Sequence, residues 1–210
     1  MTAKRVGIVV FEDVEVLDFC GPFEVFSVAR LDESHRRETA SPFEVLLVAE
    51  TVEPVRTAGG MMVFPAHGFD DCPRLDILVV PGGWGTRAQI DNPVMRDWLR
   101  ERAGEVELLA SVCTGAMLLG FAGLLDGRRA TTHWRALDWM REALPAVTVD
   151  AERHFVVDGA VWSSAGISAG IDIALRIVAH CHGEDVARTA ARYMEYPYPE
   201  SDARRIAVDA

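Results

Sequence analysis

Short apolar runs that alternate with helix-like segments restrict the folds open to this chain more than any other pattern in its sequence. The clearest runs cover residues 6–11, 76–80 and 107–112 and are rich in valine, isoleucine and leucine. Continuous apolar runs are typical of strands that are covered on both faces, as in parallel sheets. Strands that alternate with helices predict a three-layer α/β fold with a mostly parallel sheet. No linker or repeat interrupts the pattern, so we expect one domain over residues 1–210.

Local signals place the other elements. Gly59-Gly60 between short runs predicts a hairpin over residues 54–65, and Asp158-Gly159 marks a second turn. Pro22 suits the first turn of a helix and predicts that one begins there. Further strands are expected at 43–50, 147–149, 155–157 and 161–164, and helices at 23–30, 93–104, 135–144, 166–181 and 185–193. The polar segment 31–41 is expected to form a surface loop, and residues 200–210 a loose tail.

Composition and charge exclude several classes of function. The net charge of −11 argues against a nucleic-acid surface, which needs clustered lysine and arginine. No apolar run approaches the ~20 residues that span a bilayer, and no signal peptide precedes the first strand. We therefore expect a cytoplasmic protein that acts on a small molecule and binds neither nucleic acid nor membrane.

The spacing of cysteine, histidine and glycine gives no sign of a metal or nucleotide site. The four cysteines lie far apart without a C-x-x-C pair, which indicates free thiols rather than a zinc site or disulfides. His180 and His182 are too close in sequence to share one helical face. The glycine motifs that bind dinucleotides or triphosphates are absent. The sequence therefore predicts neither a metal nor an organic cofactor.

Cys113 is the strongest functional signal in the sequence. It stands where an apolar strand run gives way to a helix pattern that begins at Thr114-Gly115. Such a junction lies at the carboxyl edge of the sheet, and the start of the helix offers free N–H groups and a dipole that favour a thiolate over a thiol. A nucleophile is both exposed and activated there. The alternative is a buried cysteine that packs as a small hydrophobic residue, which is the role we expect of Cys20, Cys72 and Cys181.

Two other strand ends carry residues that would complete such a site. Asp18 follows the first strand, and Gly82-Gly83 follow the strand that ends at Val80. Sites in open α/β sheets form beyond the carboxyl ends of the strands, which predicts a thiol, a carboxyl and bare N–H groups in one pocket. A carboxyl close to a thiolate has a raised pKa and can donate a proton. The alternatives are a helix cap or a solvated acid for Asp18, and a plain tight turn for the glycines.

Three further residues are candidates for the same pocket. The N–H of Thr114 would point at any group held by Cys113, although threonine is also an ordinary residue at a helix start. Trp84 follows the glycines directly and is a candidate for shaping the substrate pocket. His133 lies 20 residues after Cys113 and is a candidate accessory base. The alternative is a structural histidine beside Trp134.

Several blocks of the sequence together resemble the ThiJ/PfpI superfamily, whose members have class I glutamine amidotransferase-like folds. The blocks are Pro81-Gly82-Gly83, Ser111–Ala116, Leu124–Trp134 and Gly166–Asp172, and the similarity extends over most of the chain. Within the superfamily, Cys113-Thr114 and the segment Leu17–Val25 are most similar to the isonitrile hydratase branch. The same blocks also occur in the sensor half of AraC-type transcription regulators, but we expect no helix-turn-helix pair here.

The resemblance carries expectations for the fold and the site. It implies a flavodoxin-like sandwich, a homodimer, and Cys113 as the nucleophile at a sharp, strained turn. In the hydratase branch a carboxylate that matches Asp18 assists proton transfer, and threonine follows the cysteine. Many protease-like members instead carry histidine at the position of Thr114, so the resemblance favours a hydratase over a protease. Deglycase-like members use a glutamate where Asp18 stands here.

The residues and the resemblance together predict an enzyme that hydrates an isonitrile to an N-substituted formamide, a hydro-lyase without a cofactor. Cys113 would attack the terminal carbon, Asp18 would donate the proton, and the N–H groups of Gly83 and Thr114 would hold the substrate or water. Gly82 and Trp84 would complete the binding surface. Two alternatives stay open: another cysteine-dependent activity of the amidase, deglycase or glyoxalase type, and a sensor that binds a small molecule or oxidises Cys113.

Overall fold

A six-stranded sheet forms the centre of the computed structural model, which describes residues 3–208. The strand order is β2-β1-β5-β6-β10-β9. The strands are β1 Lys4–Val9, β2 Phe43–Val48, β5 Ile77–Val80, β6 Leu108–Val112, β9 Phe155–Asp158 and β10 Val161–Ser164. All neighbours are parallel except β9, which pairs antiparallel with β10. The predicted α/β class with a mostly parallel sheet is confirmed.

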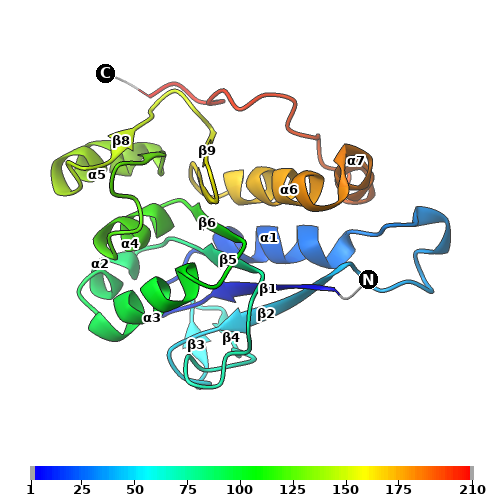
Figure 1. Ribbon diagram of the computed structural model, residues 1–210, viewed down its shortest axis with the longest axis horizontal. Coiled ribbons are helices and arrows are strands. Elements are labelled where there is room, and N and C mark those ends of the chain that lie inside the picture. Colours follow the sequence, from blue (N-terminus) through cyan, green and yellow to red (C-terminus); the bar gives the residue numbers. More distant parts are fainter. Residues whose placement is uncertain (1–2, 209–210) are drawn as a thin grey trace.

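Helices cover both faces of this sheet (Figure 1). Helices α1 Val16–Val28, α6 Ala169–His182 and α7 Glu184–Tyr193 pack against one another on one face. On the other face α3 Pro93–Ala103 packs against α4 Gly115–Phe121. Two further helices are short. They are α2 Thr86–Gln89, which comes after strand β5 in the chain, and α5 Leu137–Ala143, which comes directly after a 3-10 turn. Single 3-10 turns stand at Glu33–His35 and Trp134–Ala136.

Two small strand pairs lie outside the main sheet. β3 Val55–Arg56 and β4 Met62–Val63 form the predicted antiparallel hairpin around Gly59-Gly60. β7 Arg129–Ala130 pairs in parallel with β8 Thr148–Val149, so the strand expected at 147–149 exists but belongs to a separate sheet.

Helix α1 begins earlier than the sequence indicated. It runs from Val16, and Pro22 lies inside it rather than in its first turn. A proline there has no N–H to donate to the carbonyl four residues earlier, which is that of Asp18. Pro22 is buried, and Gly170 of α6 leaves room for its ring, so packing between the two helices outweighs the local preference. As a result Asp18 lies in the first turn of a helix.

The segment predicted to be a loose tail lies against the body of the protein as far as Arg205. The N–H of His154 donates to the carbonyl of Asp202 at 2.6 Å. Arg205 forms an ion pair with the buried Asp172 at 2.8 Å. Arg204 donates to the carbonyl of Ala151 at 2.7 Å. Residues 209–210 of the predicted tail lie outside the described residues.

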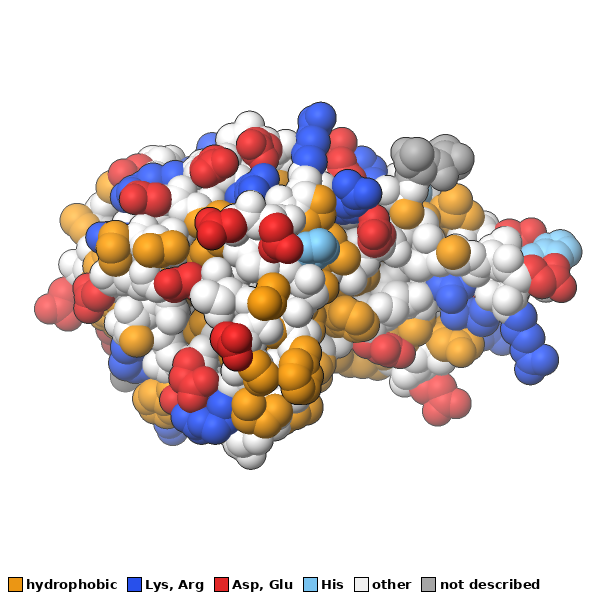
Figure 2. Space-filling model, turned by 90° about the horizontal axis from the view of Figure 1, so that it is seen from below, with side chains coloured by type: hydrophobic (Ala, Val, Ile, Leu, Met, Phe, Trp, Pro, Cys, Tyr) orange, Lys and Arg blue, Asp and Glu red, His pale blue; other side chains and the backbone are white. Residues whose placement is uncertain are grey.

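The surface carries charges of both signs with some gathered hydrophobic side chains (Figure 2). Exposed hydrophobic residues on and beside strand β4 are Met61, Met62 and Phe64. Within residues 3–208, none of the helices combines the length and the apolar character needed to cross a membrane.

Candidate active site

A sharp turn between β6 and α4 holds Cys113 at the carboxyl edge of the sheet. Its φ of 56° lies in the left-handed region, which is uncommon for a residue with a Cβ. The N–H of Cys113 donates to the carbonyl of Ala165 at 3.0 Å, and its carbonyl accepts from the Thr132 hydroxyl at 2.8 Å. A Cβ at Gly115 would lie 1.9 Å from the Val80 carbonyl oxygen, so the helix must start with glycine here. The predicted strained turn is present.

The thiol of Cys113 is 7% exposed and reaches a surface pocket. Burial raises its pKa well above the usual range, and the neighbouring Asp18 carboxylate raises it further. The N–H of Thr114 lowers the pKa, as expected of a helix start, but this effect is smaller. Burial and the Asp18 carboxylate thus oppose the thiolate that the helix start was predicted to favour. A neighbouring group must take the proton before the sulfur can attack.

Asp18 is the titratable group beside that thiol. Its side chain is fully buried, and Oδ2 accepts a hydrogen bond from the N–H of Gly82 at 2.9 Å. Burial raises its pKa to about 7, which the Gly82 N–H and the Cys113 thiol only partly offset, while the charge of Glu15 raises it further. Its Oδ1 is buried without a hydrogen-bond partner among the described residues. The expected proximity of the carboxyl and the thiol is present, and because the pKa of the thiol is raised further than that of the carboxyl, the pair holds a single proton above pH 7.

Gly82 and Gly83 do not offer the free N–H groups that the sequence predicted. The N–H of Gly82 donates to Asp18, and that of Gly83 donates to the Thr114 hydroxyl at 3.0 Å. Both donors are therefore occupied by this chain rather than free for an oxyanion. Close packing is what requires glycine at these positions: a Cβ at Gly82 would lie 2.5 Å from the Thr114 N, and one at Gly83 2.5 Å from the Asp13 carbonyl oxygen.

Thr114 connects the turn at Gly82-Gly83, here called the glycine turn, to the sharp turn at Cys113, here called the elbow. Its hydroxyl accepts from Gly83 and forms a second hydrogen bond of 2.9 Å with the hydroxyl of Thr86 on α2. Its own N–H lowers the pKa of Cys113 and so faces the sulfur. The position of Thr114 matches the sequence prediction, and its side chain also orders the wall of the pocket.

His133 reaches the pocket wall from the 3-10 turn that precedes α5. Its Nδ1 accepts the N–H of Arg135 at 3.2 Å, so the neutral ring carries its proton on Nε2. Burial lowers its pKa, and the charge of Arg135 lowers it further. A Cβ at Gly166 would lie 2.0 Å from the ring, so the imidazole packs closely against that backbone. No hydrogen bond joins His133 to Cys113 in the described structure, which favours a structural and pocket-lining role.

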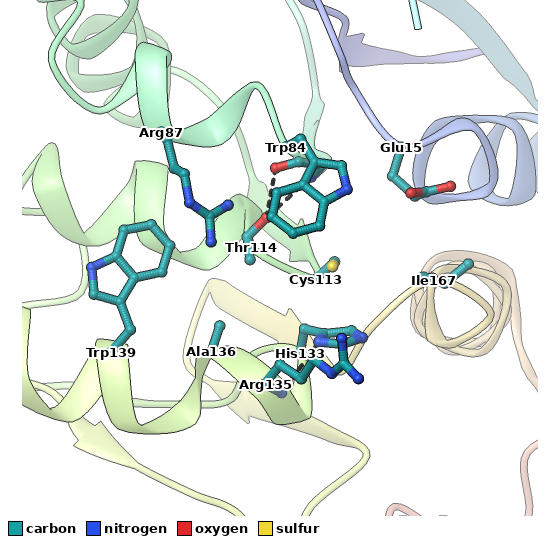
Figure 3. Close-up of a pocket in the computed structure, with 11 residues that line it drawn as sticks. Glu15, Trp84, Arg87, Cys113, Thr114, His133, Arg135, Ala136, Trp139 and Ile167 are labelled. Carbon is teal, nitrogen blue, oxygen red and sulfur yellow. Dashed lines mark hydrogen bonds between the residues drawn. The ribbon is translucent and has the colours of Figure 1, made fainter. Parts of the chain in front are cut away.

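A pocket of about 280 Å³ opens above Cys113 (Figure 3). It draws residues from the start of α1, the glycine turn with α2, the elbow, the turn before α5 with α5 itself, and the loop before α6. These residues are Glu15, Gly83, Trp84, Arg87, Cys113, Thr114, His133, Arg135, Ala136, Trp139 and Ile167. Most of the predicted site residues therefore meet here, with Asp18 behind Cys113 and Gly82 behind Thr114.

Six residues of this pocket were not predicted from the sequence: Glu15, Arg87, Arg135, Ala136, Trp139 and Ile167. Arg87, Arg135 and Trp139 come from short helical segments whose function no motif marks. Ile167 has a φ of 58°, a genuine outlier for a β-branched residue, and its N–H faces the Asp18 carboxyl closely enough to lower that pKa. The only available signal was the block Gly166–Asp172, which indicated a helix start and nothing about the pocket.

No group of three or more histidine, cysteine, aspartate or glutamate residues within positions 3–208 is arranged to hold a metal ion. The site thus combines a buried thiol, a buried carboxyl with a raised pKa, and a pocket that a small molecule can enter. Fold and site together define an α/β protein with a cysteine elbow.

Comparisons with known proteins agree with this class. The DJ-1/PfpI family profile matches residues 4–180, and the chain belongs to that family. An isonitrile hydratase from Pseudomonas putida is 35% identical over 202 residues, which cover 96% of this chain and 82% of the relative. The glutathione-independent glyoxalase DJR-1.2 from Caenorhabditis elegans is 27% identical over 68% of this chain and 75% of its own.

A solved structure shows the same fold. The crystal structure of a ThiJ/PfpI family protein from Pseudomonas syringae superposes with a TM-score of 0.82 at 29% identity. The match covers 96% of this chain and 79% of that one. The ThiJ/PfpI resemblance stated from the sequence is confirmed.

Proposed function

We propose that this protein hydrates an isonitrile to an N-substituted formamide. The observation that carries the proposal is the pairing of the Cys113 thiol with the Asp18 carboxyl, whose pKa of about 7 suits transfer of a proton at neutral pH. The similarity to an isonitrile hydratase over nearly the whole chain supports the choice of substrate class.

The first half of the reaction forms a bond between sulfur and carbon. Cys113 Sγ attacks the terminal carbon of R–N≡C while its proton passes to Asp18. Asp18 then delivers that proton to the same carbon, which gives the thioimidate R–N=CH–S–Cys113. The raised pKa of the thiol explains why the carboxylate is needed as the acceptor. Oδ1 of Asp18 supports this role, because it is buried without a fully formed hydrogen bond among the described residues and the Cys113 thiol lies close enough to the carboxyl to lower its pKa.

The second half adds water and releases the enzyme. Water attacks the thioimidate carbon, and Asp18 takes a proton from the water and passes it to the nitrogen, which gives the adduct R–NH–CH(OH)–S–Cys113. As the C–S bond breaks, Asp18 takes the proton of the hydroxyl group and passes it to the sulfur, and R–NH–CHO leaves. One water is consumed in total and the thiol is restored. The N–H of Thr114, which faces the sulfur, is the donor best placed to polarise the groups attached to it.

Hydration of para-nitrophenyl isocyanide, followed by ultraviolet absorbance, tests the proposal. We expect turnover by the wild-type protein and none above background by Cys113→Ala. Cys20→Ala is the matched control, because Cys20 lies on α1 outside the pocket, and it should retain activity. Turnover that persists in Cys113→Ala would show that the mechanism is wrong.

A glyoxalase is the second candidate, favoured by the similarity to the nematode enzyme. The same thiol would add to a reactive carbonyl instead of an isonitrile. A purified protein that converts methylglyoxal to lactate but leaves isonitriles unchanged would establish this alternative.

A redox sensor and a homodimer also remain predictions. Selective formation of a sulfinate on Cys113 after mild peroxide, without loss of the other thiols, would favour the sensor. The exposed Met61, Met62 and Phe64 support self-association, which analytical ultracentrifugation measures directly. A cytoplasmic location is likewise part of the proposal and is tested by fractionation of cells.

A further inference from the structure

Two guanidinium groups line the pocket without an acidic partner. Arg87 comes from α2 and Arg135 from the turn before α5, and both side chains are exposed. Among residues 3–208, neither guanidinium forms an ion pair or a side-chain hydrogen bond. Each lies close to tryptophan rings instead. An unpaired arginine is common on a protein surface. Two of them in the wall of one pocket create a positive electrostatic potential there.

Arg87 is held in place by two tryptophan rings. Its guanidinium carbon lies 4.8 Å from the centroid of Trp84 and 5.2 Å from that of Trp139. In Figure 3 the side chain projects from α2 into the space between these rings. Aromatic rings accept no conventional hydrogen bond, so the N–H groups of the guanidinium have no acceptor among the described residues and are available to a ligand. The rings therefore pre-organise Arg87 to bind a planar anion, because little side-chain freedom is left to lose on binding.

Charges of opposite sign lie on opposite sides of the pocket. Glu15, at the start of α1, lines the opposite side, and Figure 3 places it across the pocket from Arg87. Its charge raises the pKa of Asp18, which shows that this side is negative. An anionic substituent would be repelled from the Glu15 side and attracted to the side of Arg87. A substrate whose reactive carbon lies at Cys113 would thus direct its anionic group toward Arg87.

We propose that the substrates are isonitriles that carry a carboxylate, bound by the N–H edge of Arg87. This inference rests on the proposed hydratase function and names the substrate class of that site. A carboxylate suits Arg87 because guanidinium and carboxylate are both planar and pair through two parallel hydrogen bonds. Arg135, whose guanidinium carbon lies 4.8 Å from the centroid of the Trp134 ring, adds a second positive charge to the pocket lining.

Two para-substituted substrates of equal shape test the proposal. The wild-type protein should hydrate 4-isocyanobenzoate with a kcat/KM about tenfold or more above that of 4-isocyanobenzamide. Arg87→Gln should lower kcat/KM for the benzoate about ten- to hundredfold, mainly through KM, and change the benzamide value by less than about twofold. Arg87→Lys keeps the charge but loses the paired geometry, so it should fall between the two.

Arg74→Gln is the matched control. It removes the same charge from an exposed arginine near Arg5 and Asp76, at the opposite edge of the sheet, and should leave both substrates unaffected. Equal kcat/KM for the two substrates in the wild-type protein would overturn the proposal. So would an equal loss for both substrates in Arg87→Gln.

A binding measurement separates failure of this proposal from failure of the hydratase function. Trp84 and Trp139 flank Arg87, so benzoate bound there should change tryptophan fluorescence in a saturable way, while benzamide should not. The benzoate response should disappear in Arg87→Gln. If this response is present but neither isonitrile is hydrated, the anion site stands and the hydratase function is wrong. If isonitriles are hydrated but no benzoate response occurs, the anion site is wrong.

Discussion

Two aspartates are fully buried within residues 3–208, and their surroundings differ completely. Asp172, in the first turn of α6, accepts hydrogen bonds from Tyr196 at 3.1 Å and Arg205 at 2.8 Å and pairs with His154 at 2.7 Å. Asp18, in the first turn of α1, accepts one fully formed hydrogen bond, from the Gly82 N–H, while the Ile167 N–H and the Cys113 thiol only approach its carboxyl. Equal burial therefore produces a satisfied carboxylate in one region and an unsatisfied one in the other.

The difference separates structural from reactive burial. Cationic and hydroxyl partners hold Asp172 in place, and through Arg205 they fasten the C-terminal segment to α6. Asp18 faces a thiol and the charge of Glu15 instead of a cation, so burial raises its pKa to about 7. Groups in such a position are candidates for proton transfer, because their protonation changes near the working pH. Substitution of either aspartate, or titration of Asp18, tests whether their roles differ in this way.

The largest expected effect is on catalysis by Asp18→Asn. The amide keeps the shape and can still accept the Gly82 N–H, but it cannot carry the thiol proton. We expect the rate of isonitrile hydration at pH 8 to fall about 10²- to 10⁴-fold, with the fold intact by circular dichroism. Asp172→Asn, measured on the folded fraction, should retain most of the activity. Comparable losses in the two variants would remove the distinction drawn between the two carboxyls.

The next effect is on stability, and it concerns Asp172→Asn. Removing this charge leaves Arg205 and His154 without their buried partner. Breaking a buried ion pair on one side costs about 3–5 kcal/mol, and urea unfolding should show a loss of that size. A loss below about 1 kcal/mol would mean that the network around Asp172 contributes little to the fold.

Asp18→Asn should change stability in the opposite direction at alkaline pH. Between the ordinary carboxyl pKa of 3.8 and the folded value of about 7, the folded protein holds a proton that the unfolded chain has lost. The stability linked to that proton is complete below pH 3.8 and is lost as pH rises through 7. The variant lacks this loss, so at pH 8 it should be more stable than the wild type by at most about 4 kcal/mol. Urea unfolding at pH 4 and pH 8 measures the difference, and a variant less stable than the wild type at pH 8 would contradict it.

The smallest effect is the pH dependence of the rate. The reactive pair needs one proton, so kcat/KM should fall about tenfold per pH unit below 7 and level off above it. The plateau should extend well into the alkaline range, because the pKa of Cys113 is raised. Initial rates from pH 5 to pH 9 provide the profile. A rate that stays constant from pH 5 to pH 7 would be incompatible with a proton acceptor at Asp18.

The sequence predicts the scaffold of this site better than its details. The carboxyl ends of parallel strands meet at one edge, so the convergence of Cys113 and the segment after the first strand follows from the alternation of strands and helices. The strained turn at Cys113 follows from the family resemblance. Pro22 indicated the wrong start for α1, because a contact with α6 outweighs the local preference of proline.

Other features depend on contacts that no local pattern encodes. The N–H groups of Gly82 and Gly83 are occupied by Asp18 and by Thr114, which lie 64 and 31 residues away in sequence. The sign of the Cys113 pKa shift depends on how deeply the thiol is buried. Arg87 and Trp139 meet only because α2 and α5 both stand at the edge of the pocket. Contacts of this kind can be identified from the folded structure but not from the sequence.

The titration of the Asp18 carboxyl tests the central claim most directly. Carbon-13 NMR of protein labelled at aspartate carboxyl groups follows each side chain with pH, and the Asp18 signal is assigned by its absence in Asp18→Asn. The account predicts a midpoint of about 7 for this carboxyl. A midpoint near the ordinary 3.8 would show that Asp18 is a permanently charged neighbour of Cys113, and the shared-proton mechanism would be wrong.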